Sequence, residues 1–171
     1  MADEVSDFLV DPNGENFLRL RSLVGASPAY EAASDGDERL AGLIAAGEYD
    51  QASELAADLM PNWLLSARVH RLASIAAEGT GDAEAAARER YLWRACARGL
   101  LLAGDGSPER PYPILHVSDE YELLDALGKE PTGQRVVEGR EGPCDVITCD
   151  DGSQVWFDIT ASLRNQASNI R

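Results

Sequence analysis

Asp145 and Asp158 are the two side chains best placed to act together in catalysis or metal binding, because they flank the turn signal Asp151-Gly152. If those two turn residues form a type I′ hairpin loop, the two aspartates face each other across an antiparallel ladder. Directly opposed carboxylates repel, so a metal ion, a shared proton or an arginine such as Arg135 must compensate. The pair is therefore a candidate for a small hydrolytic or metal-binding site. A structural arrangement with Arg135 or the backbone is the alternative, and a three-residue loop would separate the pair.

Other catalytic and metal-binding chemistries find little support in the sequence. His70 and His116 are the only histidines, so a histidine-rich zinc site cannot be built. Cys144 and Cys149 are five residues apart on one predicted strand, where their thiols diverge, which argues against zinc and against a disulfide. The sequence has no lysine-containing phosphate loop and no Gly-x-Ser-x-Gly motif. Outside the aspartate pair we therefore expect no metal, no cofactor and no catalytic residue.

Trp63, Arg68 and Arg71 are the candidates for binding a partner protein, in a groove that stacked helical hairpins would present. For Trp63 the alternative is a place in the core, because tryptophan is usually mostly buried. The two arginines belong to the one cationic region of the chain, within residues 61–106. Their alternative role is to pair with the acidic first sixty residues.

Charge narrows the class of partner. The chain has 171 residues, 30 of them acidic and 15 basic, which gives a formal net charge of −15. This balance argues against nucleic acid and against an anionic membrane surface, since both are polyanions. The sequence predicts a non-enzymatic protein-interaction module whose partner is another protein. In one variant the chain neutralises a basic protein, as immunity proteins do, and binding then weakens with added salt. The sequence leaves the oligomeric state open.

The first two thirds of the sequence have the periodicity of amphipathic helices. We expect a short helix around residues 17–23 and four more helices over about 37–47, 49–60, 63–78 and 83–102. Gly47 ends the second of these five helices and Pro61 ends the third. The segments that begin at Gly47 and Gly81 are 34 residues apart, which is the tetratricopeptide period. They resemble two degenerate tetratricopeptide-like hairpins, with plain αα-hairpin packing as the alternative. Two units are too few for a solenoid, so another part of the chain must cover the open end.

The last third changes character and alternates strands with one helix. We expect a short strand at 113–117, a helix that Ser118 caps, and strands over about 134–138, 144–149 and 154–160. The predicted fold class is α+β, with N-terminal helical hairpins packed on a small antiparallel sheet that carries one helix. Residues 15–104 form the helical region and 107–161 the α+β region of one compact unit. Residues 1–14 and 162–171 are expected to be frayed tails.

A set of short motifs and single residues follows in order along the second half of the chain: Ala103-Gly104-Asp105-Gly106, Asp119-Glu120-Tyr121-Glu122-Leu123-Leu124, Leu127-Gly128, Gln134, Asp145 and Trp156-Phe157-Asp158-Ile159. In these residues the chain from Phe17 to Ile159 resembles a bacterial domain family of unknown function. Members of that family join a helical half to a small strand-rich half. The resemblance implies the two-part fold and implies no activity.

The sequence also bears on location. It begins without a basic and an apolar segment typical of a secretory signal, and its longest aliphatic stretch, Leu100–Ala103, is far too short to span a membrane. The cysteines number three, an odd count that favours reduced thiols. We therefore expect a cytoplasmic protein.

Overall fold

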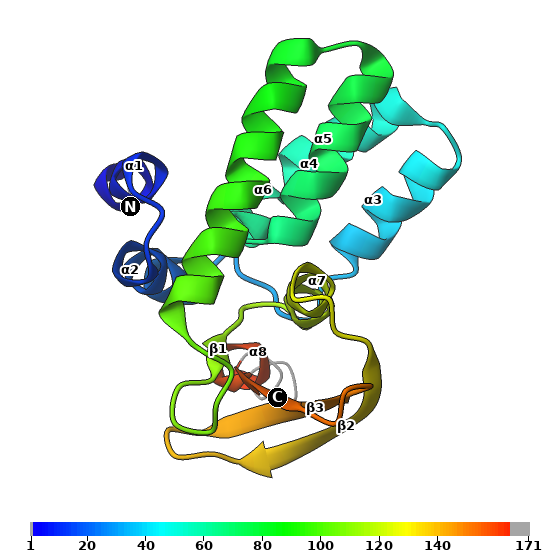
Figure 1. Ribbon diagram of the computed structural model, residues 1–171. Helices are drawn as coiled ribbons and strands as arrows, with labels where there is room; N and C mark the ends of the chain where they lie inside the picture. Colours follow the sequence, from blue (N-terminus) through cyan, green and yellow to red (C-terminus); the bar gives the residue numbers. More distant parts are fainter. Residues whose placement is uncertain (1, 165–171) are drawn as a thin grey trace, which may run out of the picture.

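In the computed structural model, which describes residues 2–164, a layer of helices lies on a small sheet (Figure 1). The helical half comprises α1 (Ala2–Val10), α2 (Gly14–Gly25), α3 (Gly36–Ala45), α4 (Tyr49–Trp63), α5 (Ala67–Thr80) and α6 (Ala83–Ala103). The second half comprises β1 (Tyr112–Pro113), α7 (Ser118–Ala126), β2 (Pro131–Glu138), β3 (Pro143–Cys149), β4 (Gln154–Asp158) and α8 (Thr160–Arg164). The predicted α+β class is confirmed.

Helices α3 to α6 pack as antiparallel neighbours joined by short turns (Figure 1). The turn between α5 and α6 needs a left-handed residue, which Gly81 supplies with φ 79°. The side chain of Asp82 then accepts a hydrogen bond from the backbone N–H of Ala85 and caps α6. Close contact between α4 and α5 depends on Gly79, where a Cβ atom would lie 2.1 Å from the ring of Tyr49. The predicted helical hairpins are thus confirmed.

The N-terminal segment is a helix where the sequence predicts a frayed tail. Phe8 of α1 is 2% exposed and lies 6.1 Å from the ring of Phe17, measured between ring centroids. Both rings lie against Gly99 of α6, where a Cβ atom would come within 2.8 Å of each. This aromatic contact holds α1 against the helical half. At the other end, residues 162–164 belong to α8, and the rest of the predicted C-terminal tail lies outside the described residues.

Pro61 lies inside α4 rather than after its end, so the predicted boundary at Met60 is wrong. A proline near the end of a helix removes only one hydrogen bond, and the helix continues to Trp63. The next helix consequently begins later than predicted, at Ala67. Its cap is Ser66, whose side chain accepts a hydrogen bond from the backbone N–H of Val69.

The sheet has the strand order β1-β4-β3-β2 and is mixed, because β1 pairs with β4 in parallel. The predicted sheet was purely antiparallel, which holds for the β2–β3 and β3–β4 pairs only. The β3–β4 loop is one residue longer than predicted and spans residues 150–152, with Gly152 at φ 78°. Its closing hydrogen bond runs from the N–H of Cys149 to the carbonyl of Ser153. The longer loop shifts the register by one residue.

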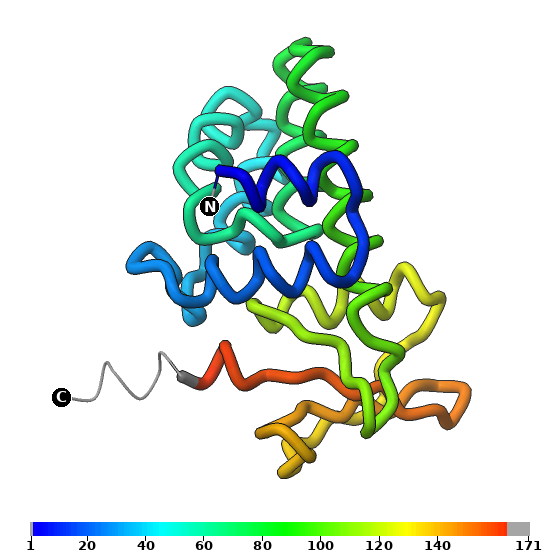
Figure 2. The backbone as a smooth tube through the Cα atoms, turned by 90° about the vertical axis from the view of Figure 1, so that its left-hand side faces the viewer, coloured from blue at the N-terminus to red at the C-terminus, as the bar shows by residue number. Residues whose placement is uncertain are grey.

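One hydrophobic core joins the two halves. Phe17 of α2 and Leu100 of α6 belong to the same buried cluster as Leu124 of α7, Ile147 of β3 and Phe157 of β4. The sheet therefore covers one end of the helical layer, as Figure 2 shows from the side. A second, smaller core lies among α3, α4 and α5.

Candidate functional site

The two aspartates that the sequence paired point to opposite faces of the sheet. Asp145 is the partner of Phe157 and Asp158 is the partner of Cys144, so neighbouring positions of the ladder hold the two carboxylates. The predicted facing of Asp145 and Asp158 is wrong because of the three-residue loop. Arg135, the expected counter-charge, donates instead to the side-chain oxygen of Gln154 at 3.3 Å.

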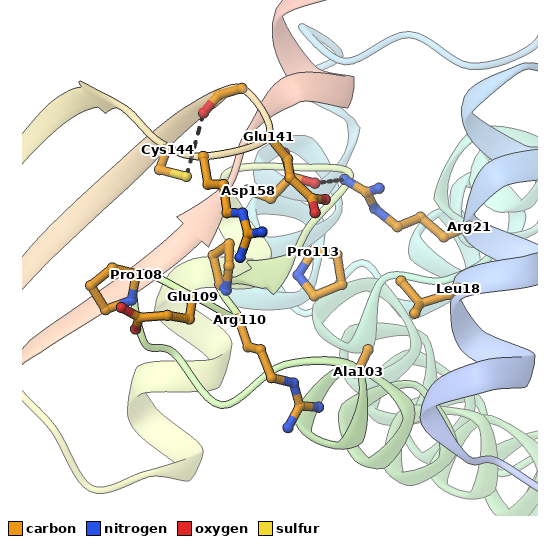
Figure 3. Close-up of a pocket in the computed structure, with 13 residues that line it drawn as sticks. Leu18, Arg21, Ala103, Pro108, Glu109, Arg110, Pro113, Glu141, Cys144 and Asp158 are labelled. Atoms are coloured by element: carbon orange, nitrogen blue, oxygen red, sulfur yellow. Dashed lines mark hydrogen bonds and ion pairs between the residues drawn. The ribbon is translucent and has the colours of Figure 1, made fainter.

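Asp158 forms an ion pair with Arg21 of α2, with 3.0 Å between the guanidinium nitrogen and the carboxylate oxygen. The pair lies in the wall of a cavity of about 320 Å³ between α2, the end of α6 and the β2–β3 turn (Figure 3). Burial and then the charges of Asp158 and Glu138 raise the pKa of the Cys144 thiol in this wall, which makes it a poor nucleophile. The charged lining balances, with three arginines (Arg21, Arg110 and Arg140) against three acids (Glu109, Glu141 and Asp158).

A second cavity, of about 470 Å³, lies where α3 begins, α4 ends and α7 begins, and is called the α3–α7 cavity. Two of the three predicted partner-binding residues, Trp63 and Arg68, line it. The remaining lining comes from the segment before α3 and from the starts of α3 and α7: Ala32, Ala33, Ser34, Asp35, Asp37, Glu38, His116, Val117, Ser118 and Tyr121.

Two rings of the α3–α7 cavity lining, those of Trp63 and His116, stack on each other. The rings of Trp63 and His116 lie 3.7 Å apart between centroids at an angle of 17°, and Tyr30 meets His116 edge-on at 5.5 Å. Trp63 is 2% exposed and belongs to the core of α3, α4 and α5. Burial lowers the pKa of His116 to about 4, so its ring is neutral at pH 7. Its Nε2 lies 3.2 Å from the carbonyl oxygen of Asn62, which makes Nε2 the protonated nitrogen.

One wall of the α3–α7 cavity is charged. Arg68 Nε donates to a carboxylate oxygen of Asp37 at 2.9 Å, and Asp37 is buried. Asp35 and Glu38 are exposed and make no ion pair within the described residues. Three carboxylates thus face a single arginine, and the cavity is net negative.

Arg71 lies outside the α3–α7 cavity. Its guanidinium donates two hydrogen bonds to the carboxylate of Glu122 on α7, at 2.8 and 3.1 Å. Next to it, Ser66 Oγ donates to Asp119 at 2.8 Å, and burial raises the pKa of Asp119 to about 7. Both contacts link the start of α5 to α7. The structure thus brings two of the predicted partner-binding residues together and gives the third a role in packing α7.

Sequence reasoning missed a buried acidic pair beneath α7, formed by Glu120 and Asp145. Glu120 is 0% exposed, and neither of its carboxyl oxygens has a hydrogen-bond partner among residues 2–164; the same holds for one oxygen of Asp145. The other Asp145 oxygen accepts from the amide of Gln134, whose oxygen accepts from the hydroxyl of Tyr121 at 3.0 Å. Burial, then the charges of Asp145 and Asp119, raise the pKa of Glu120 to about 8.

The signal that could have found this group is the motif resemblance, because all four residues belong to it. Glu120 lies in the first turn of α7, where an exposed carboxylate would complement the helix dipole. The structure instead turns this side chain toward the sheet and buries it. No cluster of three or more His, Cys, Asp or Glu side chains within the described part of the chain could hold a metal ion.

Another buried ion pair lies between α5 and α6. His70 Nδ1 lies 2.8 Å from a carboxylate oxygen of Glu89, and Nε2 lies 3.0 Å from the carbonyl oxygen of Leu64. Burial alone lowers the pKa of His70, but its contacts with Cys96 and Glu89 more than offset this and raise the pKa to about 10. The ring is therefore an imidazolium with both nitrogens donating.

The sequence matches the model of one known protein family. The model of a family described as a domain of unknown function (DUF4919) matches residues 28–168, most of the chain. The chain belongs to the DUF4919 family. The DUF4919 match contains the α3–α7 cavity and the acidic pair, and it leaves out α1 and α2. No curated protein and no solved structure matches the chain. Among the helices of residues 2–164, none is long and apolar enough to cross a bilayer.

Proposed function

We propose that this DUF4919 chain is a non-enzymatic protein-interaction module whose partner is a basic protein. The observation that carries the proposal is the acidic surface formed around α3 and α4. Residues 31–58 contain eight acidic side chains and a single basic one, Arg39. Seven of the eight are exposed and make no ion pair within the described residues: Glu31, Asp35, Glu38, Glu48, Asp50, Glu54 and Asp58. These seven residues are called the acidic α3–α4 surface.

The shape of this surface also suits a partner. An open groove of about 540 Å³ runs between α3 and α4. Leu43 and Leu55 are in its lining, and Glu54 and Asp58 outnumber the one basic lining residue, Arg39. Apolar side chains next to unpaired carboxylates favour a surface that combines basic and apolar groups. Such complementarity raises the rate of association with a basic protein and opposes association with an acidic one.

The arginines of residues 61–106 do not neutralise the acidic α3–α4 surface. Within residues 2–164, Arg68 is the only one of them that forms an ion pair with the first sixty residues, and its partner is Asp37. The others pair elsewhere: Arg71 with Glu122, Arg88 with Glu89, and Arg90 with Glu78. The sequence alternative in which this cationic region pairs with the acidic segment therefore fails except at Arg68, and the carboxylates stay available to a partner.

The separation of Asp145 from Asp158 supports the non-enzymatic interpretation over a hydrolytic or metal-dependent one. The free, buried state of the three cysteines supports a reducing, cytoplasmic setting.

The proposal is tested by capture from native lysate at low and at high salt. A variant of the acidic α3–α4 surface, Glu38→Gln/Glu54→Gln/Asp58→Asn, is compared with a control of equal charge change on the other half, Asp125→Asn/Glu130→Gln/Glu141→Gln. All six side chains are exposed. We expect wild type and control to capture the same basic protein at low salt, and the surface variant to lose it. Capture of that protein by the surface variant, or no capture at either salt, would overturn the proposal.

A further inference from the structure

We propose that the α3–α7 cavity receives a lysine or arginine side chain of the partner, together with the peptide carbonyl beside it. The inference rests on the proposed function and assigns the chemistry of one contact within it. Three features of the cavity carry it: its charge, its apolar lining residues, and three buried polar atoms of the lining that lack partners.

The charge of the cavity favours a cation. Its titratable lining consists of Asp35, Asp37 and Glu38 against Arg68, with a neutral imidazole at His116. Arg68 engages Asp37, while Asp35 and Glu38 are exposed and unpaired within residues 2–164. A cation that enters meets two free carboxylates at the rim and a net negative potential inside.

Two apolar residues of the lining suit the aliphatic part of a basic side chain. Val117 and Tyr121, both on the α7 side, are 46% and 43% exposed although they are large and apolar. The methylene groups of lysine or arginine pack on such surfaces while the charged end stays polar. The ring of Tyr121 adds a cation–π contact for an approaching ammonium or guanidinium.

Three buried polar atoms of the lining residues show that a cation alone does not complete the site. Trp63 Nε1, His116 Nδ1 and Ser118 Oγ have no hydrogen-bond partner in the part of the chain that the structure describes. With its proton on Nε2, His116 offers Nδ1 as an acceptor, which suits the N–H groups of lysine or arginine. An indole N–H only donates, so it needs an acceptor, which lysine and arginine side chains lack. A peptide carbonyl next to the basic residue supplies one. The chemistry therefore favours a peptide segment over an inorganic cation.

The test uses small probes that contain only the proposed groups: N-acetyl-arginine N-methylamide, N-acetyl-lysine N-methylamide and, as a neutral match, N-acetyl-norleucine N-methylamide. The readout is the indole N–H resonances of the three tryptophans, assigned with Trp93→Phe and Trp156→Phe. We expect a basic probe to shift the Trp63 signal saturably, with Kd in the millimolar range, and to leave the other two in place. No shift of Trp63, or an equal shift with the norleucine probe, would overturn the inference.

Matched variants separate a local contact from the overall charge. Asp35→Asn/Glu38→Gln removes the rim carboxylates and should weaken the basic probe at least about tenfold. Glu48→Gln/Asp50→Asn removes the same charge at the start of α4, outside the cavity lining, and should change Kd less than about twofold. Equal weakening by both variants would overturn the inference.

The two proposals fail separately. Probes that do not bind, while the acidic α3–α4 surface variant still loses its partner, overturn the cavity inference and support the proposed function. Probes that bind as expected, while that surface variant captures the same partner as wild type, overturn the proposed function and support the cavity as a site for basic side chains.

Discussion

Arg21 of α2 donates to Asp158 of β4 at 3.0 Å and to the carbonyl of Ile114 at 2.9 Å, so one guanidinium links the helical half to the sheet. The side chains of Arg21 and Asp158 are 16% and 27% exposed, which limits screening by solvent. Hydrogen bonds that involve a charged group and are shielded in this way are among the stronger polar contacts in proteins.

Replacing Arg21 by methionine should lower the free energy of unfolding by about 1–3 kcal/mol, because Asp158 and the Ile114 carbonyl lose a buried donor. Urea unfolding measures the change. Arg19→Met is the control on the same helix, since Arg19 pairs with Asp7 and Glu15 at the surface, and it should cost less than about 0.5 kcal/mol. Equal losses in the two variants would show that the link between the halves contributes no stability of its own.

Glu120→Gln should make the protein more stable at pH 8 and leave it nearly unchanged at pH 5. The folded state raises the pKa of Glu120 from 4.5 to about 8, so it holds a proton that the unfolded chain releases. Stability from this group is therefore present below pH 4.5 and is lost as pH rises toward 8. The free energy of unfolding of Glu120→Gln at pH 8 should therefore exceed that of the wild type by about 4 kcal/mol. Urea unfolding at both pH values measures this difference, and Glu130→Gln, at an exposed site, is the control. A stability gain of Glu120→Gln that does not grow with pH would contradict a raised pKa at Glu120.

The two histidines should occupy opposite charge states at pH 7. The pKa of His70 is raised to about 10 and that of His116 is lowered to about 4, so His70 is an imidazolium and His116 is neutral with the proton on Nε2. Long-range ¹H–¹⁵N spectra of the imidazole nitrogens distinguish these forms directly. Neither ring should titrate between pH 6 and 8, and a titration of either ring within that window would show that its environment is misassigned.

Gly104→Ala should destabilise the fold by about 1–3 kcal/mol. A Cβ atom at residue 104 would lie 2.7 Å from the carbonyl oxygen of Pro111 and 3.0 Å from that of Arg110, and backbone atoms cannot rotate away. Gly42→Ala is the matched control, because a Cβ atom there meets nothing within 4 Å on α3, and it should stabilise by up to about 1 kcal/mol. Thermal unfolding compares the two; a neutral Gly104→Ala would mean that the 104–111 loop adjusts freely.

Periodicity in the sequence was enough to predict the helices from α3 to α6 and the strands β3 and β4, since their apolar faces are buried as the pattern requires. Local pattern was not enough where one residue decides the outcome. Helix α1 depends on Phe8, a single ring whose partner Phe17 lies on another helix. The facing of Asp145 and Asp158 depended on loop length, and a change of one residue placed them on opposite faces.

The candidate site was predictable in part for the same reason. Trp63 at the end of α4 and Arg68 at the start of α5 are close in sequence, and both line the α3–α7 cavity. Their neighbours His116 and Tyr121 come from beyond α6, and no spacing rule connects residues so far apart. The burial of Glu120 likewise depends on how α7 lies over the sheet, which is a property of tertiary packing.

The start of the DUF4919 match does not mark where the protein can be truncated. The match starts at residue 28, yet Phe17, Leu20 and Val24 of α2 fill the same hydrophobic core as Leu100 and Phe157. A polypeptide trimmed to the matched region would expose these core side chains to water, and we expect it to aggregate. Evolutionary domain and folding unit therefore have different first residues in this chain.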